Sequence, residues 1–233
     1  MIKMILKILH LIFTVDRSIE ETPTQLRGFM GSKFEKYPEL HHHQISSKGN
    51  NKLKYEYPKI QYNLNNNKAI ILGIGDKAIK VLKNIVMNIN ELVLGKNTYK
   101  IIEINAHYKE SEFGIINKGE MISYKFKSPW LALNKENYMK FKSCSIAGRR
   151  EMLKKILIGN ILSMSKHLEY DVPDTIHVDI ELSSLKVLYK YVPLVGFKGI
   201  FETNFLIPDY LGVGKGVSHG FGTVQRTSNN SLN

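Results

Sequence analysis

Three consecutive histidines, His41, His42 and His43, lie in the stretch "LHHHQ" and are of a type suited to acid–base chemistry. An imidazole changes charge near neutral pH, so it can take a proton from one atom and give one to another. Alternate residues of an extended chain share a side, which lets His41 and His43 converge while His42 points away. Two other interpretations remain: a metal site, although no carboxylate cluster lies nearby in sequence, or a surface loop without function.

Lysines alternate with tyrosines after the histidines, between residues 48 and 62. Cations that contact phosphates, beside rings that stack on bases, suit single-stranded nucleic acid or the flank of an RNA hairpin. For each lysine taken singly, the solvent-exposed face of a β-hairpin explains the pattern better. The residues are Lys48, Lys52, Lys54, Lys59, Tyr55, Tyr57 and Tyr62.

Five glycines crowd the stretch "LGVGKGVSHGFGTV", residues 211–224, with Lys215, Ser218 and His219 between them. Such a density indicates a backbone that approaches a ligand closely, and the basic and hydroxyl neighbours indicate an anionic ligand. Neither a Walker loop nor a dinucleotide fingerprint fits, because each must open a helix and only a short polar segment follows Gly222. The alternative is a glycine-rich hairpin that turns the corner of a sheet.

A second glycine motif, Gly73-x-Gly75-x-x-Ala78, follows a strand-like run and opens a helical one, with Glu103 on a later strand. This order matches a dinucleotide-binding fingerprint. The asparagines at 65–67, however, predict a tight turn and therefore an antiparallel pair of strands, whereas such a site requires a parallel pair. We therefore expect no cofactor at this motif.

The chain is strongly basic, with 33 Lys+Arg against 21 Asp+Glu, a formal net charge of +12 and a pI near 9.5. Clustered cations bind a polyanion by releasing its counterions, which favours nucleic acid as the partner. Because aromatics and glycines accompany the charge, we favour nucleic acid over a membrane surface. A compositional bias towards Lys, Asn and Ile is the alternative explanation. Basic residues in one predicted helix are Arg149, Arg150, Lys154 and Lys155.

Cys144 is the single cysteine, which excludes a disulfide framework and a cysteine-based zinc site and fits a reducing cytoplasm. The apolar run over residues 1–16 is interrupted by Lys3, Lys7 and His10, and no small-residue cleavage site follows it. It therefore predicts a β-strand instead of a signal peptide. No later segment is long enough to cross a membrane.

The order of predicted elements in the first half is βαββαβ, the ferredoxin-like unit. Strands are expected at 3–16, 54–64, 68–74 and 97–108, and helices at 22–37 and 76–92. Three- and four-residue spacing predicts that one face of the second helix is buried. Its inward residues are Ile79, Leu82, Val86, Ile89 and Val93.

The second half repeats this outline, with strands at 120–133, 175–191, 196–208 and 220–225 and a long amphipathic helix at 145–168. We therefore predict an α+β protein of two tandem ferredoxin-like domains, 1–112 and 118–225, followed by a disordered tail at 226–233. The inward residues of the long helix are expected to be Ile146, Leu153, Leu157, Ile161, Met164 and Leu168.

Taken together, these features resemble the CRISPR-associated repeat-RNA endoribonucleases of the RAMP superfamily, the Cas-six family, and most closely its b-type branch. The glycines match that family's G-h-G-x5-G-h-G signature, from Gly212 to Gly222. The segments "QLRGFMGSKF", "YEYPKIQY" and "YKFKSPWLALNKENYMKF" are also similar to the b-type branch. The resemblance covers nearly the whole chain and implies two ferredoxin-like, RRM-like domains with a C-terminal glycine-rich loop that helps to hold RNA.

The resemblance implies cleavage of a CRISPR precursor transcript within each repeat, without a metal or cofactor, by attack of a ribose 2′-hydroxyl on the adjacent phosphate. Histidines two residues apart align with His41 and His43, of which His43 is the first choice for general base or acid, and a tyrosine aligns with Tyr55 as an orienting group. The RNA-binding candidates are Lys52, Lys54, Arg149, Arg150, Gly214, Lys215, Ser218, His219 and Gly220.

The expected partner is CRISPR repeat RNA, with other CRISPR effector-complex proteins and a second copy of the chain as further partners, and no membrane. The alternative function is a non-catalytic RNA-binding or scaffold member of the same superfamily.

Overall fold

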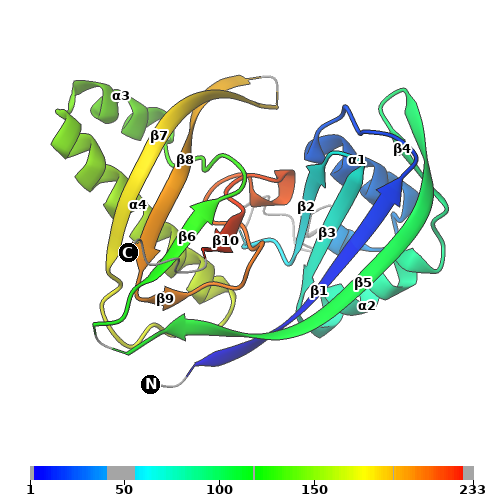
Figure 1. Cartoon of the computed structure of the whole chain (residues 1–233), viewed down its shortest axis with the longest axis horizontal. Helices are drawn as coiled ribbons and strands as arrows, with labels where there is room; N and C mark the ends of the chain where they lie inside the picture. Colours follow the sequence, from blue (N-terminus) through cyan, green and yellow to red (C-terminus); the bar gives the residue numbers. More distant parts are fainter. Residues whose placement is uncertain (1–2, 41–55, 118, 191, 228–233) are drawn as a thin grey trace, which may run out of the picture. The chain divides into compact units, whose positions relative to one another are not determined.

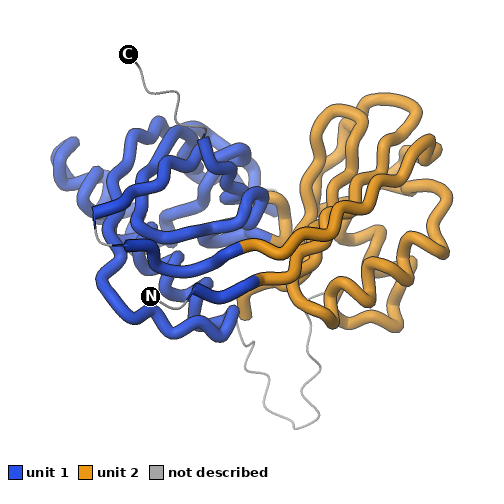
Figure 2. The backbone as a smooth tube through the Cα atoms, turned by 60° about the horizontal axis from the view of Figure 1, so that its bottom comes forward, with its two compact units in different colours: residues 1–5, 112–217, 221–233 blue, residues 6–111, 218–220 orange. Residues whose placement is uncertain are grey.

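The computed structural model describes residues 3–40, 56–117, 119–190 and 192–227. The chain forms two compact units, shown in two colours in Figure 2. Their boundary is not a single point in sequence, because strands β1 (Met4–Val15) and β5 (Asn97–Ile115) both run through it. Unit 1 comprises Met1–Ile5, Glu112–Val217 and Phe221–Asn233, and unit 2 comprises Leu6–Ser111 and Ser218–Gly220.

Unit 2 is built on a sheet with the strand order β2-β3-β1-β5-β4 (Figure 1). The β2–β3 hairpin turns at Asn66, whose φ of 52° lies in the left-handed region that asparagine tolerates. The expected antiparallel pair is therefore confirmed, and the Gly73 motif lacks the parallel strands of a dinucleotide site. The remaining strands of this sheet are β2 (Ile60–Asn65), β3 (Lys68–Ile74) and β4 (Glu91–Leu94).

Two helices, α1 (Pro23–Lys33) and α2 (Gly75–Val86), pack against this sheet and close its core. The start of α1 is fixed by a capping box, in which the Thr22 backbone N–H donates to the Gln25 side chain at 2.9 Å. A short 3-10 helix, η1 (Pro38–Leu40), follows α1 and buries Leu40 in the same core. The two helices contribute Leu26, Met30, Ala78, Leu82 and Ile85 to it.

The expected helix at 76–92 is too long, because α2 ends at Val86 and residues 91–94 form strand β4. The Asn88 side chain donates to the Asn84 carbonyl at 2.8 Å, and Gly95 turns the chain into β5 with a φ of 60°. Asparagine favours such local bonds over continued helix, which explains the early end. Val93, expected on the buried face of the helix, is instead 39% exposed on β4.

Unit 1 has the same arrangement of four strands, in the order β10-β6-β8-β7. In the opposite direction from that given above, and without β4, the strands of unit 2 have the equivalent order β5-β1-β3-β2. Both units therefore have the strand order of a ferredoxin-like fold, as expected. Where unit 2 has its second helix, the segment between β8 and β10 contains the glycine-rich stretch and the short 3-10 helix η2 (Val217–His219), whose last two residues belong to unit 2. The strands are β6 (Ile122–Phe126), β7 (Val178–Tyr189), β8 (Val192–Thr203) and β10 (Val224–Arg226), with β9 (Phe205–Leu206) paired to the end of β5.

The expected long helix of unit 1 is present as α4 (Ile146–His167), preceded by a helix that was not expected, α3 (Lys135–Ser143). Leu153, Leu157, Ile161, Met164 and Leu168 are buried as expected, but Ile146 is 86% exposed. No residue of α4 before Leu153 is buried. Strand β10 extends through Arg226, and residues 228–233 of the expected tail lie outside the described residues.

Candidate active site

Residues 41–55, which we call the histidine segment, lie outside the described residues, and with them His41, His43, Lys52, Lys54 and Tyr55. Strand β2 makes hydrogen bonds to described residues on either side of this segment. The buried Tyr62 hydroxyl donates to the carbonyl of Leu40, directly before His41, at 3.4 Å. At the other end, the Gln61 side chain donates to the Tyr57 hydroxyl at 3.0 Å and to the Pro58 carbonyl at 3.1 Å.

Tyr57 and Tyr62 are core residues and do not offer their rings to RNA bases, contrary to the expectation for this tyrosine-rich stretch. Their exposed fractions are 8% and 0%. Burial raises the pKa of both phenols, and for Tyr62 the nearby charge of Arg27 opposes that rise only in part. Both hydroxyls therefore stay protonated at neutral pH and act as hydrogen-bonding groups.

The glycine-rich stretch folds back on itself between β9 and β10. The Val213 backbone N–H donates to the Gly222 carbonyl at 2.8 Å, and Gly212 pairs with Thr223 as an isolated β-bridge. At Gly222, with a φ of 67°, a Cβ would lie 2.1 Å from the Val213 carbonyl oxygen. The glycines of the signature thus allow backbone to pack against backbone, which is the role of a sheet-corner hairpin as well as of a ligand loop.

Lys215 is the exposed cation of this stretch, and its Nζ lies 5.5 Å from the centre of the Tyr189 ring at the end of β7. Lys190 Nζ lies 5.7 Å from the same ring, which Phe221 meets edge-on at 5.7 Å. Gly214, by contrast, is half-buried over the bond from Trp130 Nε1 to Asn160 Oδ1. Gly214 and Lys215 are therefore neighbours in the sequence with different surroundings: Lys215 is an exposed cation, and Gly214 lies over an internal hydrogen bond.

The tip of the stretch, Ser218–Gly220, belongs to unit 2 and packs on α1. His219 is only 6% exposed. Its Nδ1 lies 3.0 Å from Thr24 Oγ1, and its Nε2 lies 2.7 Å from a guanidinium nitrogen of Arg27. His219 was expected to contact RNA backbone, whereas the structure places both of its ring nitrogens against protein groups.

Sequence reasoning missed Thr24 and Arg27, because nothing in their spacing relates them to His219, which lies 192 positions beyond Arg27. Both occupy the first two turns of α1. Only the three-dimensional fold brings a residue near the end of the chain to this helix.

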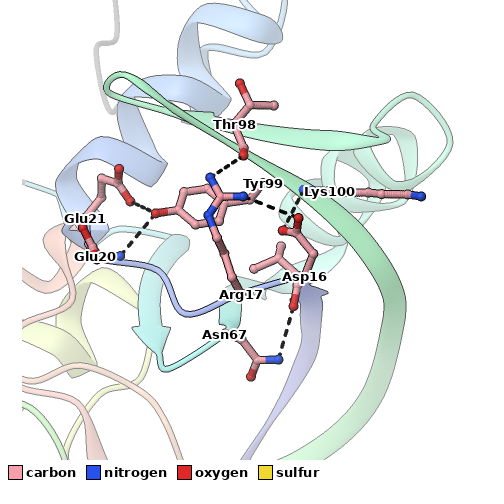
Figure 3. A network of polar contacts seen from close by, with 9 residues as sticks. Asp16, Arg17, Glu20, Glu21, Asn67, Thr98, Tyr99 and Lys100 are labelled. Carbon is pink, nitrogen blue, oxygen red and sulfur yellow. Dashed lines mark hydrogen bonds and ion pairs between the residues drawn. The ribbon is translucent and has the colours of Figure 1, made fainter.

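A polar network fixes the segment that leads from β1 into α1 (Figure 3). Asp16 accepts from the Lys100 backbone N–H at 3.1 Å, and Arg17 donates to the Thr98 carbonyl at 2.8 Å. Glu21 accepts from the Tyr99 hydroxyl at 2.6 Å (Figure 3). Strand β5 therefore holds the start of the helix that carries Thr24 and Arg27.

The two arginines predicted to bind RNA both make contacts within unit 1. Arg149 donates to the carbonyls of Phe141 and Lys142, at 2.9 and 3.0 Å, at the C-terminal end of α3. Arg150 pairs with Asp179 at 2.8 Å. Burial acts to raise the pKa of Asp179, but hydrogen bonds from the Ile180 backbone and Arg150 outweigh it and lower that pKa.

Within the described ranges, no group of three or more His, Cys, Asp or Glu is arranged to hold a metal ion. The described helices include none that is long and apolar enough to span a membrane.

Comparison with known proteins gives matches along almost the whole chain. Residues 4–112 match the model of the Cas6b N-terminal domain, and residues 116–227 match that of the Cas6b C-terminal domain. An uncharacterized protein of Methanocaldococcus jannaschii is 46% identical over 143 residues, which are 61% of this chain and 96% of that protein.

Two solved structures agree with the family match. A crystal structure of Cas6b has a TM-score of 0.87 and 36% identity, covering 96% of this chain and all of that one. A Cas6b described as a CRISPR RNA processing endoribonuclease has a TM-score of 0.73 and 33% identity, over 96% of this chain and all of that one. On these matches, which confirm the resemblance seen in the glycine signature, the chain belongs to the Cas6b family.

Proposed function

We propose that this chain is an endoribonuclease that cleaves CRISPR precursor RNA within its repeats, without a metal ion, and releases guide RNAs. The observation that carries the proposal is the match over 96% of the chain to a Cas6b described as a CRISPR RNA processing endoribonuclease. On either side of the histidine segment, described residues are bonded to β2: the Tyr62 hydroxyl donates to the Leu40 carbonyl, and the Gln61 side chain donates to the Pro58 carbonyl.

The proposed reaction is an in-line transesterification. The ribose 2′-oxygen forms a bond to the adjacent phosphorus while the bond from phosphorus to the 5′-oxygen breaks, which leaves a 2′,3′-cyclic phosphate and a 5′-hydroxyl. One histidine of the pair His41 and His43 takes the 2′ proton and the other protonates the leaving oxygen. Tyr55 orients the phosphate, and Lys52 and Lys54 offset the charge that develops on it.

A labelled repeat RNA incubated with the protein in excess EDTA tests this mechanism. We expect cleavage in EDTA, and we expect none when the 2′-hydroxyl at the cut site is replaced by hydrogen. Cleavage that requires a divalent ion would overturn the metal-independent mechanism, and a band shift without cleavage would support the scaffold alternative.

His43→Ala tests the assignment of the base or acid. Single-turnover cleavage should fall by about 10²–10⁴-fold, the usual contribution of general acid–base catalysis, while RNA affinity stays close to that of the parent. His107→Ala is the matched control, because His107 is an exposed histidine on β5 outside the proposed site. If His43→Ala cleaves at the parental rate, the assignment to His43 is wrong and His41→Ala is the next variant to measure.

A further inference from the structure

Helix α3 (Figure 1) carries tyrosine, methionine and lysine side chains on a face that is exposed to solvent. Lys135, Tyr138, Met139 and Lys142 follow one another at three- and four-residue spacing, which places them along one side of the helix. We call this side the α3 face. Tyr138 is 38% exposed and Met139 is 63% exposed, and no residue of the helix is buried. Because the apolar side of a surface helix normally packs on a core, this exposed stripe indicates a ligand outside the chain.

The α3 face belongs to a helix that is fixed at both ends. At its start the Asn134 side chain accepts from a backbone N–H of the first turn at 2.7 Å. At its end Arg149 donates to the carbonyls of Phe141 and Lys142. Phe141, which lies outside the stripe, meets the Phe197 ring of β8 edge-on at 5.7 Å. The exposed side chains are therefore already in place before a ligand binds, which lowers the entropy cost of binding.

The lysines of α3 differ in their partners. Lys140, which is not part of the α3 face, pairs with Glu136 at 2.6 Å. Among the described residues, neither Lys135 nor Lys142 has a carboxylate within ion-pair distance. The α3 face therefore carries two positive charges that the described part of the chain does not neutralise, and an anionic ligand is the complement to it.

The contact between Lys142 and Tyr138 indicates the class of anion. Lys142 Nζ lies 5.6 Å from the centre of the Tyr138 ring. An exposed ring beside an ammonium group suits an unpaired nucleotide, whose base can stack on the ring while its phosphate contacts the cation. A protein partner fits less well, because lysine is depleted at protein–protein interfaces. Charge and ring together favour single-stranded RNA.

We propose that the α3 face binds an unpaired stretch of the precursor RNA, with a base stacked on Tyr138 and phosphates in contact with Lys135 and Lys142. This surface includes none of the residues that the sequence predicted to bind RNA. The inference rests on the proposed function for the identity of the RNA, but the binding itself can be measured without cleavage.

A labelled repeat RNA with deoxyribose at the cut site, which prevents the proposed cleavage, is the probe for stacking. Tyr138→Leu keeps the apolar bulk and removes the ring, so its Kd should rise by about 5- to 100-fold, the contribution of one stacked base. Tyr138→Phe keeps the ring and should bind like the parent. On the same RNA annealed to its full complement, Tyr138→Leu and the parent should bind equally. Equal Kd values on the unannealed RNA, or an equal loss on both RNAs, would overturn the proposal.

The salt dependence of the Kd tests the two lysines. Lys135→Gln combined with Lys142→Gln should reduce the slope of log Kd against log salt by about 1.4, since each phosphate contact to a single strand contributes roughly 0.7. Lys140→Gln is the matched control: it removes a paired cation from the same helix and should leave the slope unchanged. An unchanged slope in the double variant, or the same loss per charge in the control, would refute phosphate contact at the α3 face.

Thermal unfolding identifies any loss of binding that comes from a damaged fold. Because α3 buries no residue, all of these variants should keep a midpoint close to that of the parent. If the parent binds repeat RNA but does not cleave the all-ribose form, the proposed function fails, whereas the comparison of Kd values still decides whether the α3 face binds RNA.

Discussion

At Gly220 the structure requires glycine for two reasons at once, its left-handed backbone and its contact with Pro23. Gly220→Val should destabilise unit 2 by about 1–3 kcal/mol from backbone strain alone, and the lack of space for a Cβ adds to this. We expect a lower denaturation midpoint in urea. RNA binding should also weaken if Ser218–Gly220 no longer packs on α1. A variant as stable as the parent would contradict the observed packing.

Gly28 provides the matched control for Gly220. It lies on the exposed face of α1, and a Cβ there would meet nothing within 4 Å. Because alanine is the better helix former, Gly28→Ala should leave stability unchanged or raise it by about 0.5–1 kcal/mol. The same urea titration, run on both variants, separates a strained glycine from an ordinary one.

Glu21 gives a pH dependence of known sign. Burial acts to raise its pKa, but hydrogen bonds from Tyr99 and Asn97 outweigh this and lower the pKa below the ordinary value of 4.5. A lowered folded pKa adds stability that is complete above the unfolded pKa and is lost as the pH falls through the folded one. Glu21→Gln keeps the shape and the acceptor, so we expect its stability to fall less steeply than that of the parent below pH 4.5. Parallel acid unfolding curves would contradict this assignment.

Single residues were predicted best where one local rule decides their role. The turn at Asn66, the cap at Thr22 and most of the buried face of α4 follow from backbone preference and periodicity, and the structure confirms them. His219 could not be predicted in this way, because its partners Thr24 and Arg27 are brought to it only by the completed fold. The roles of His41 and His43 stay predictions.

At the scale of elements, Arg149 stabilises the junction of α3 and α4. Its bonds to the Phe141 and Lys142 carbonyls satisfy the end of a helix that buries no residue of its own. Arg149→Gln should therefore cost about 1–2 kcal/mol of stability, from lost charged hydrogen bonds at a helix C-terminus. Arg150→Gln, which loses an exposed pair with Asp179, should cost at most about 1 kcal/mol. Thermal unfolding of both variants checks the order, and the reverse order would contradict it.

The elements missed by sequence reasoning are those that depend on neighbours. Strand β4 exists because β5 offers it an edge, from Glu91 opposite Lys100 to Leu94 opposite Asn97, although the same residues continue a helical pattern. Helix α3 was missed because it has no buried face and therefore no apolar periodicity to detect. Hydrophobic periodicity in a sequence predicts helices and strands that bury one face, and it does not detect those that bury none.

At the scale of the whole molecule, the net charge of +12 predicts a strong salt dependence. The affinity for repeat RNA should fall linearly with salt concentration on logarithmic axes, because bound phosphates release counterions. Lys215→Gln should reduce that slope by about one if this exposed lysine contacts a phosphate. Arg150→Gln gives the comparison, since its partner in the structure is Asp179. If Lys215→Gln and the parent give the same slope, the cation beside Tyr189 makes no phosphate contact.

Because Ser218–Gly220 belong to unit 2, this unit can be completed only after nearly the whole chain has been synthesised. A ribosome that adds about 5–20 residues per second needs roughly 5–20 s to move from Ser111, where the first stretch of unit 2 ends, to Ser218–Gly220. During that time the nascent α1 already carries Thr24 and Arg27, but His219 has not yet been synthesised. A chain that stalls before residue 219 can form the sheet of unit 2 and still lacks the imidazole that holds Arg27. An interrupted chain would therefore lack both the contacts of His219 with α1 and the packing of Gly220 on Pro23, even where its first half is folded.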